Sequence, residues 1–223
     1  MAKQYSAEFK LEAVRRIERT KEPVARVAAD LGVNENTMHR CLKQYRVAKL
    51  CKVLLNQEFT ADRPNQKMVS DITYLWTDEG CLYISAVMDL FRQKIVGLSM
   101  SDRMTKELPI NALRSAWLHS GRIHSDRGSQ YCSNDYQALL KDFGFICSMS
   151  RKGNCWDNAP METFWGKMKY EWLYGFRFRT CDEARVAVFE YVQIFFYNRN
   201  RLHASNDYLM PEEYYNIGSK KAA

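Results

Sequence analysis

The chain has 223 residues, of which 46% are hydrophobic and 13% aromatic. This composition excludes a disordered protein and is sufficient for one sizeable core and a small additional domain. The formal net charge is +7, and residues 1–50 contribute +5 of it, with eleven Lys and Arg against six Asp and Glu. A basic folded segment indicates a polyanion partner, nucleic acid first, with an ordinary solvated surface as the equal alternative on charge alone.

Cysteine usage and hydropathy exclude several protein classes. The seven cysteines are an odd number and form no CxxC pair, which argues against a disulfide framework and a zinc knuckle and favours reduced thiols in the cytoplasm. Residues 1–10 are charged and lack the apolar stretch of a signal peptide. Because no run of about 18 apolar residues occurs, we expect no membrane association.

Three helices are predicted at the front of the chain, over residues 6–19, 23–31 and 35–45. Ser6 can cap the first helix, and Pro23 stands at the start of the second. Gly32 follows the second helix, where a tight turn needs a positive φ that glycine adopts without strain.

The second and third helices have the spacing of a helix-turn-helix. Ala28 is small enough for close helix approach, and Gly32 follows four residues later. Apolar residues of the third helix face inward, which leaves a polar outer face for base edges and phosphates. The predicted DNA contacts on this face are Asn34, Asn36, Thr37, Arg40 and Lys43. An ordinary three-helix bundle with a polar surface is the alternative.

We divide the chain into a helix-turn-helix domain over residues 1–46, a linker over 47–66 and a catalytic domain over 67–223. The linker is too short for the roughly three to four heptads of a coiled coil. Beyond it, strands are predicted over residues 68–77, 81–90, 93–100, 122–125 and 145–149, and helices over 104–118, 133–143, 157–173 and 180–198. This order predicts an α/β domain whose mixed sheet has three antiparallel strands followed by parallel crossovers.

Three acids stand out by their positions in these elements. Asp71 lies inside the first strand, Asp126 follows a short strand, and Glu162 lies in the first turns of the long helix. A carboxylate in an apolar strand is unfavourable, and a cluster of acids requires a cation to neutralise it. All-oxygen ligands favour Mg²⁺, with Mn²⁺ as a substitute, and two such ions suit phosphoryl transfer. Taken singly, each acid could equally be a capping, loop or solvated residue.

The sequence motifs around these acids resemble those of the bacterial insertion-sequence transposases of the IS-three group. The catalytic domain of that group has the RNase H-like fold of retroviral integrases. Asp126 and Glu162 are separated by 35 residues, the spacing of the DDE signature in that group. The segments Ser70–Tyr74, His124–Tyr131 and Ser148–Ala159 match its motifs. The group's closing motif is matched by Tyr197, Asn198, Arg201, His203, Tyr208 and Pro211.

The resemblance implies that Asp71, Asp126 and Glu162 bind two metal ions and catalyse cleavage and strand transfer at the ends of a mobile element. It also implies double-stranded DNA as partner, at least a dimer on DNA, and no small-molecule cofactor. Lys169 lies two helical turns after Glu162 on the same face, like the lysine that contacts the DNA end in integrases. Further DNA contacts are expected from Arg127, Arg151, Lys152 and Asn158.

The chain departs from the group's pattern in several places. The segment 47–66 is short where relatives carry a leucine zipper, and the connection leading to Asp126 is shortened. Cys41 and Met68 replace expected tryptophans, His39 a common tyrosine, and Asn206 and Asp207 a Leu-Gly pair. Two alternatives to an active transposase therefore stay open: a catalytically silent DNA-binding relic or repressor, and an RNase H-type nuclease acting on RNA–DNA hybrids.

Overall fold

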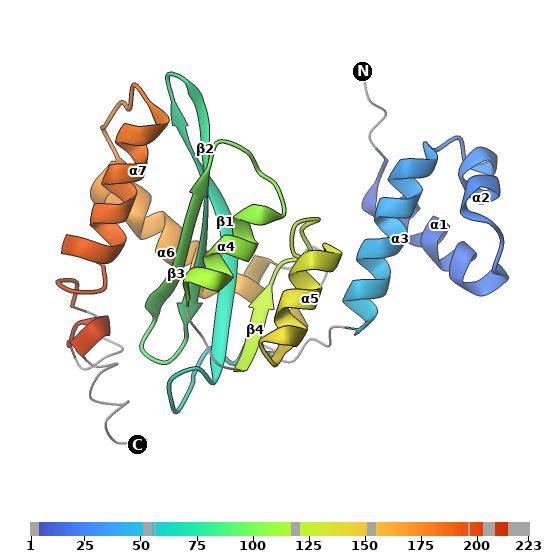
Figure 1. Cartoon of the computed structure of the whole chain (residues 1–223). Coiled ribbons are helices and arrows are strands. Elements are labelled where there is room, and N and C mark those ends of the chain that lie inside the picture. The colour runs from blue at the N-terminus through green and yellow to red at the C-terminus, as the bar shows by residue number, and fades with distance from the viewer. Residues whose placement is uncertain are drawn as a thin grey trace.

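The computed structural model describes residues 5–50, 55, 57–116, 121–150, 155–195, 197–202 and 208–213. A small helical domain at the N-terminus lies beside a larger α/β domain (Figure 1). Within the described part of the chain, every helix is too short or too polar to cross a membrane.

The front domain consists of α1 (Ala7–Thr20), α2 (Val24–Asp30) and α3 (Glu35–Leu50). Ser6 caps α1 as predicted, since its Oγ accepts a hydrogen bond from the Phe9 N–H at 3.2 Å. Gly32 has a φ of +62° in the turn before α3. The core holds the residues predicted to face inward: Ala28, Val33, Met38 and Leu42 are all buried. The sequence therefore predicted this domain well.

The predicted linker is partly structured. Helix α3 continues to Leu50, into the range assigned to the linker. Val47 packs against the apolar cluster under α4 and α5, and Leu55 is buried in the main core of the larger domain. These apolar residues are too few for a coiled coil, but they give the segment a packing surface.

The larger domain is built on a five-stranded sheet, in the order β3-β2-β1-β4-β5. Its strands are β1 (Lys67–Thr77), β2 (Gly80–Asp89), β3 (Lys94–Ser101), β4 (Gly121–Ser125) and β5 (Phe145–Met149). The first three pair antiparallel, and β4 and β5 run parallel to β1. The predicted mixed sheet is confirmed.

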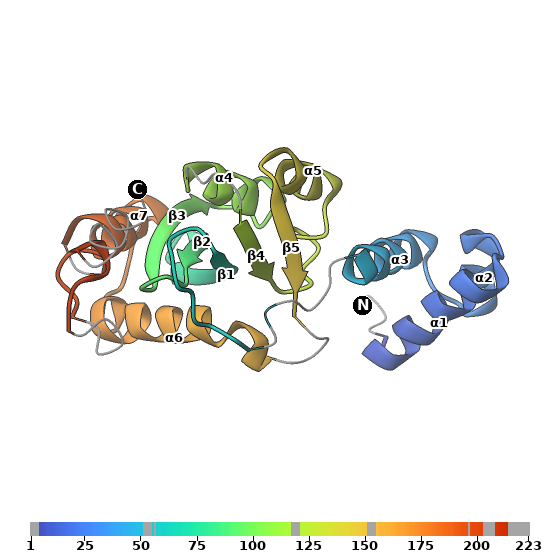
Figure 2. The same cartoon turned by 90° about the horizontal axis from the view of Figure 1, so that it is seen from below.

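Helices cover both faces of the sheet (Figure 2). On one face lie α4 (Glu107–Ser115) and α5 (Asn134–Asp142), and on the other lie α6 (Ala159–Met168) and α7 (Cys181–Phe189). Each layer has its own apolar cluster. Met68, which replaces an expected tryptophan, is fully buried in the cluster under α4 and α5.

The long helix predicted over residues 157–173 is interrupted. It begins as a 3₁₀ turn (Cys155–Asn158), continues as α6 and ends in a π-helical turn (Lys169–Leu173). Asn158 occupies the N-cap position, whereas Asp157 is buried and accepts a hydrogen bond from Gln57 at 3.2 Å.

The last predicted helix also changes type along its length. Thr180 caps α7 by accepting a hydrogen bond from the Glu183 N–H at 3.1 Å, and the Glu183 carboxylate accepts one from the Arg179 N–H at 2.7 Å. The continuation over Glu190–Phe195 is π-helical. Both π turns lie where Glu171 forms a two-point ion pair with Arg201, at 2.6 and 2.9 Å, and accepts a hydrogen bond from Tyr191.

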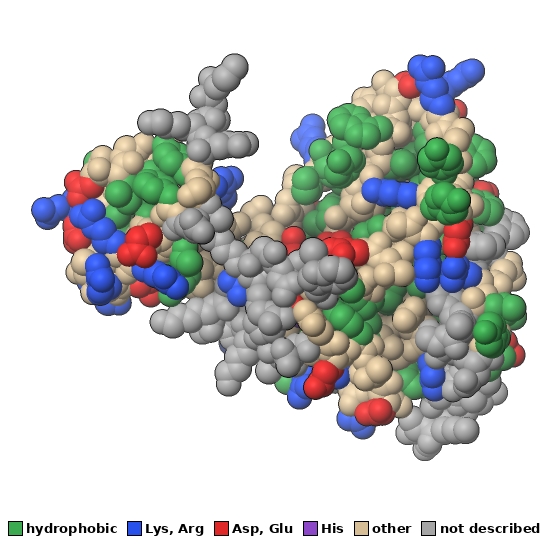
Figure 3. Space-filling model, turned by 180° about the vertical axis from the view of Figure 1, so that it is seen from behind, with side chains coloured by type: hydrophobic (Ala, Val, Ile, Leu, Met, Phe, Trp, Pro, Cys, Tyr) green, Lys and Arg blue, Asp and Glu red, His purple; other side chains and the backbone are tan. Residues whose placement is uncertain are grey.

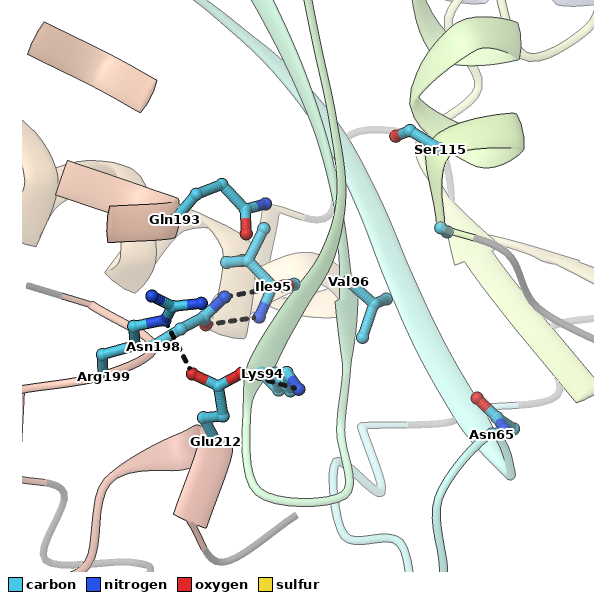
Figure 4. Close-up of a pocket in the computed structure, with 10 residues that line it drawn as sticks. Asn65, Lys94, Ile95, Val96, Ser115, Gln193, Asn198, Arg199 and Glu212 are labelled. Atoms are coloured by element: carbon cyan, nitrogen blue, oxygen red, sulfur yellow. Dashed lines mark hydrogen bonds and ion pairs between the residues drawn. The ribbon is translucent and has the colours of Figure 1, made fainter. Parts of the chain in front are cut away.

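Side chains cap the exposed edge of β3. The Asn198 amide accepts from Ile95 N–H at 3.1 Å and donates to Ile95 O at 2.9 Å, which imitates a neighbouring strand (Figure 4). Ser115 bonds both the N–H and the carbonyl of Leu98. The motif residue Asn198 thus protects an edge strand and belongs to the fold.

Candidate metal-dependent active site

The candidate site lies where β1 and β4 part. These strands pair only over Lys67–Val69 and Arg122–His124, with Val69 opposite His124. Continuing that register by two residues places Asp71 level with Asp126. Both aspartates line a cavity of about 120 Å³. The fold therefore brings together two acids that are 55 positions apart in the sequence.

Asp71 lies inside this cavity, where its ionised form is unfavourable. Its Oδ2 accepts a hydrogen bond from the Trp165 indole N–H at 3.1 Å. The pKa of Asp71 is raised to about 7, chiefly by loss of solvation and further by the negative charges of Asp126 and Glu162. Two repelling carboxylates with a raised pKa are the electrostatic signature of a site that a cation would relieve.

Asp126 is oriented by the turn that follows it. Its Oδ1 accepts a hydrogen bond from the Gly128 N–H at 2.8 Å. The residue is exposed overall, but protein atoms crowd its carboxyl group, and this burial raises its pKa. A Cβ on Gly128 would lie 2.9 Å from Asp126 Oδ1, so only glycine leaves room for this carboxylate orientation.

Glu162 is near the aspartates but does not close the site. It lies in the first turn of α6 and is exposed. Its charge contributes to the raised pKa of Asp71, although it does not line the cavity. Among the described residues, no three His, Cys, Asp or Glu side chains lie close enough together to hold a metal ion.

Two sets of buried polar contacts precede the aspartates along β1 and β4. Ser70 Oγ bonds both the Ala86 carbonyl and Tyr131 Oη, at 3.0 and 3.1 Å. His124 lies between Ser148 and Ser150, at 2.8 and 3.1 Å from their hydroxyls. Burial lowers the pKa of His124 to about 4, so it is neutral near pH 7. These residues lie in the sequence motifs given above, but the sequence predicted no role for them.

The structure separates the predicted DNA contacts of the larger domain. Lys169 begins the π turn, and its ammonium lies 5.4 Å from the centre of the Tyr74 ring. Arg127 donates from Nε to the Ser150 carbonyl at 2.7 Å. Asn158 is buried and donates to the Ser70 carbonyl at 3.4 Å, which does not favour the predicted DNA contact. Arg151 and Lys152 lie outside the described residues.

The predicted reading face of α3 is open to solvent. Asn36, Arg40 and Lys43 are exposed, and Thr37 is half-buried. Asn34 is exposed too, but its side-chain oxygen accepts hydrogen bonds from the N–H groups of Asn36 and Thr37, at 3.0 and 3.4 Å. Asn34 therefore starts the helix as a cap. Lys43 lowers the pKa of Asp135 on α5, a small effect beside that of Lys106, which places Lys43 close to the larger domain.

Comparison with known proteins gives the family. An integrase core domain model matches residues 61–155, a second integrase core domain model matches residues 144–211, and a transposase helix-turn-helix model matches residues 1–61. The chain is 46% identical over 168 residues to the transposase InsF of insertion sequence IS3A from Escherichia coli, which covers 73% of this chain. The chain belongs to the IS-three group of bacterial insertion-sequence transposases.

This IS-three group member is shorter than its curated relatives. It is also 51% identical over 156 residues to an uncharacterized 31 kDa protein of insertion element IS600 from Shigella sonnei, covering 68% of this chain. The matches span 57% of that relative and 58% of the Escherichia coli transposase. The chain thus spans somewhat over half the length of the relatives it matches.

Solved structures show the same fold as this chain. The HTLV-2 integrase catalytic core, a structure in complex with magnesium, has a TM-score of 0.53 at 15% identity, covering 70% of this chain and 99% of that one. The core domain of BIV integrase has a TM-score of 0.52 at 14% identity, covering 71% and 98%. The predicted RNase H-like, integrase-like fold is confirmed.

Proposed function

We propose that this transposase cleaves DNA at the ends of its element and joins those ends to target DNA in a reaction that depends on Mg²⁺ or Mn²⁺. The observation that carries the proposal is the position of Asp71 and Asp126, level with each other where two parallel strands part. Glu162 would be the third acid. The order of a helix-turn-helix before an integrase core supports DNA as the substrate.

The residues fit a divalent cation. Their donors are all carboxylate oxygens, which Mg²⁺ and Mn²⁺ prefer. The raised pKa of Asp71 arises partly from its acidic neighbours, so a cation between the carboxylates would remove a repulsion that the protein otherwise carries. Gly128 leaves the space that the Asp126 carboxylate occupies. Asp71, Asp126 and Glu162 would hold two such ions, which supply charge neutralisation at the reacting phosphate.

The chain's own groups orient the reaction. The Trp165 indole fixes Asp71, and the Gly128 N–H fixes Asp126. Lys169 and Arg127 would hold flanking phosphates. Water, and later a DNA 3′-hydroxyl, attacks the scissile phosphorus; the P–O bond on the opposite side breaks, and the leaving strand takes the electron pair. Asp71 must lose its proton before it can bind a metal ion, because only the ionised carboxylate binds a cation.

DNA recognition and assembly complete the proposal. The exposed α3 residues Asn36, Arg40 and Lys43 would contact the element's terminal repeats, with Asn34 starting the helix that presents them. Cleavage and joining of two ends require two active sites, so we propose at least a dimer on DNA.

A nicking and joining assay tests this function. Duplex DNA carrying the element's ends is incubated with the full chain and Mg²⁺ or Mn²⁺. Asp126→Asn should abolish metal-dependent products, whereas the matched change Asp142→Asn, at an exposed acid at the end of α5, should leave them unchanged. Salt-sensitive DNA binding without products in any variant would instead identify a catalytically silent DNA-binding protein. Cleavage of RNA–DNA hybrids in preference to duplex DNA would identify a nuclease.

A further inference from the structure

Two large aromatic side chains lie uncovered next to the candidate site. Trp76 is 69% exposed and Tyr74 is 49% exposed. They are two residues apart in β1, so they share one face of the strand. Their rings meet edge to face with centres 6.0 Å apart. Tryptophan is enriched at binding interfaces, because its ring offers a large apolar face together with a polar N–H group.

The strand that carries these rings is well anchored on its other face. Leu75 packs against the main core, and Thr77 Oγ1 lies 3.6 Å from Cys181 Sγ. The turn beyond is fixed by a hydrogen bond from the Asp78 N–H to the Phe178 carbonyl at 3.0 Å. The exposure of Trp76 is therefore a property of a held strand and not of a loose end.

A cation and the candidate site adjoin the rings. Beyond Val69, β1 no longer pairs with β4, and Lys169 lies with its ammonium 5.4 Å from the centre of the Tyr74 ring. Tyr74 also lines the cavity that contains Asp71 and Asp126. Trp76 follows Asp71 by five residues, roughly 17 Å along an extended strand. Asp71 and Trp76, an odd number of residues apart, point to opposite sides of β1, and Tyr74 connects them at the open edge of the strand, because it lines the cavity of the acids and its ring meets Trp76.

This combination fits one kind of ligand. An ammonium binds a phosphate, and an exposed indole offers a face for base stacking, which every base provides in single-stranded DNA. A protein partner would fit a broad apolar surface better. Beside the Tyr74 ring lies instead the Lys169 ammonium, and on the face of the molecule shown in Figure 3 hydrophobic side chains are interleaved with Lys, Arg and acidic ones.

We propose that Trp76 stacks on an unpaired base of the DNA strand whose phosphate enters the Asp71–Asp126 site, and that Tyr74 is the positioning residue that holds Trp76 and Lys169. The bases of an intact duplex are already stacked, so the ligand is a frayed or single-stranded stretch a few nucleotides from the reacting phosphate. This inference rests on the proposed function.

Binding of fluorescein-labelled oligothymidine to the full chain, followed by fluorescence anisotropy, tests the stacking. Trp76→Ala should weaken binding about 5- to 100-fold, and Trp76→Phe should retain most of it. Tyr174→Ala is the control, because Tyr174 is 81% exposed and lies after the π turn. Equal affinity for Trp76→Ala and the unchanged chain would overturn the proposal.

The role of Tyr74 has a separate readout in the salt dependence of binding. Tyr74→Leu should reduce the magnitude of the slope of log affinity against log salt concentration by about one, because one phosphate contact is lost. Lys169→Gln should have the same effect. Tyr74→Phe keeps the ring and should keep the slope. An unchanged slope in Tyr74→Leu would remove Tyr74 from the proposal.

Photo-crosslinking locates the base directly. A DNA end with 5-iodouracil at its first unpaired positions should crosslink to Trp76, and crosslinks confined to other residues would contradict the proposal. Failure here is distinguishable from failure of the proposed function. If stacking is wrong but the function is right, Trp76→Ala still joins DNA while Asp126→Asn does not; if the function is wrong, no variant joins DNA.

Discussion

At the scale of single residues, the site depends on two aspartates and on the small groups that orient them. The sequence singled out Asp71, Asp126 and Glu162 by their positions in the predicted strands and long helix, and the resemblance to the insertion-sequence transposases predicted their metal-binding role. It gave no sign that Trp165 donates to Asp71 or that Gly128 makes room for Asp126, because these contacts join segments that only the fold brings together.

Metal binding should depend on pH through Asp71. Its pKa is raised from 3.8 to about 7. Between pH 3.8 and about pH 7, Asp71 is therefore protonated in the folded metal-free protein but ionised in the unfolded chain. Stability of the metal-free protein therefore falls as pH rises through that window. Mn²⁺ affinity, measured by calorimetry, should strengthen as pH rises from about 6 to 8 because a bound proton no longer competes.

The matched variant is Asp71→Asn. It should raise the stability of the metal-free protein at pH 8 by on the order of 2 kcal/mol, because a repelled buried charge is removed. It should also abolish the Mn²⁺-induced rise in melting temperature. A pH-independent Mn²⁺ affinity in the unchanged chain would show that Asp71 does not bind the metal.

Gly128 should be sensitive to substitution because it leaves room for the Asp126 carboxylate. In Gly128→Ala the new Cβ pushes the Asp126 carboxylate from its position, and metal affinity should fall about 10- to 100-fold, the usual loss when a supporting contact of a ligand is removed. Gly166→Ala is the control, since a Cβ there meets no atom within 4 Å. Equal losses in both variants would refute the steric argument.

At the scale of elements, alternation and turn residues predicted the strands within a residue or two. The two π turns were not predicted, because they depend on the distant pairing of Glu171 with Arg201 and Tyr191. The parting of β1 from β4 after Val69 was also invisible in the sequence. Strand pairing is decided between segments, whereas periodicity describes each segment alone.

The cap on β3 yields a stability prediction. Asn198→Ala removes both amide contacts to Ile95 and leaves buried backbone groups without partners, which should lower the free energy of unfolding by about 1–3 kcal/mol. Urea denaturation measures this, with Asn134→Ala, at an exposed position in the first turn of α5, as control. Wild-type stability in Asn198→Ala would mean that water replaces the amide without loss.

At the scale of the whole molecule, a basic helix-turn-helix domain precedes an integrase-like core, as the charge distribution and the order of the motifs indicated. The placement of Lys43 near Asp135 on α5 was not foreseeable, because it depends on how α3 packs through Val47 onto the larger domain. The family and the fold are thus readable from one sequence, and the roles of the three acids stay predictions. The relation between the helix-turn-helix domain and the core is a tertiary property that a single sequence does not reveal.

The central claim is that Asp71 and Asp126 carry a metal-dependent attack on a DNA phosphate. The most direct test replaces one non-bridging oxygen of the scissile phosphate with sulfur and measures strand joining in Mg²⁺ and in Mn²⁺. Mn²⁺ accepts sulfur better than Mg²⁺ does, so joining should fail in Mg²⁺, return in Mn²⁺, and be absent from Asp71→Asn and Asp126→Asn under both conditions. Joining that is indifferent to the metal, or that survives loss of either aspartate, would contradict the account.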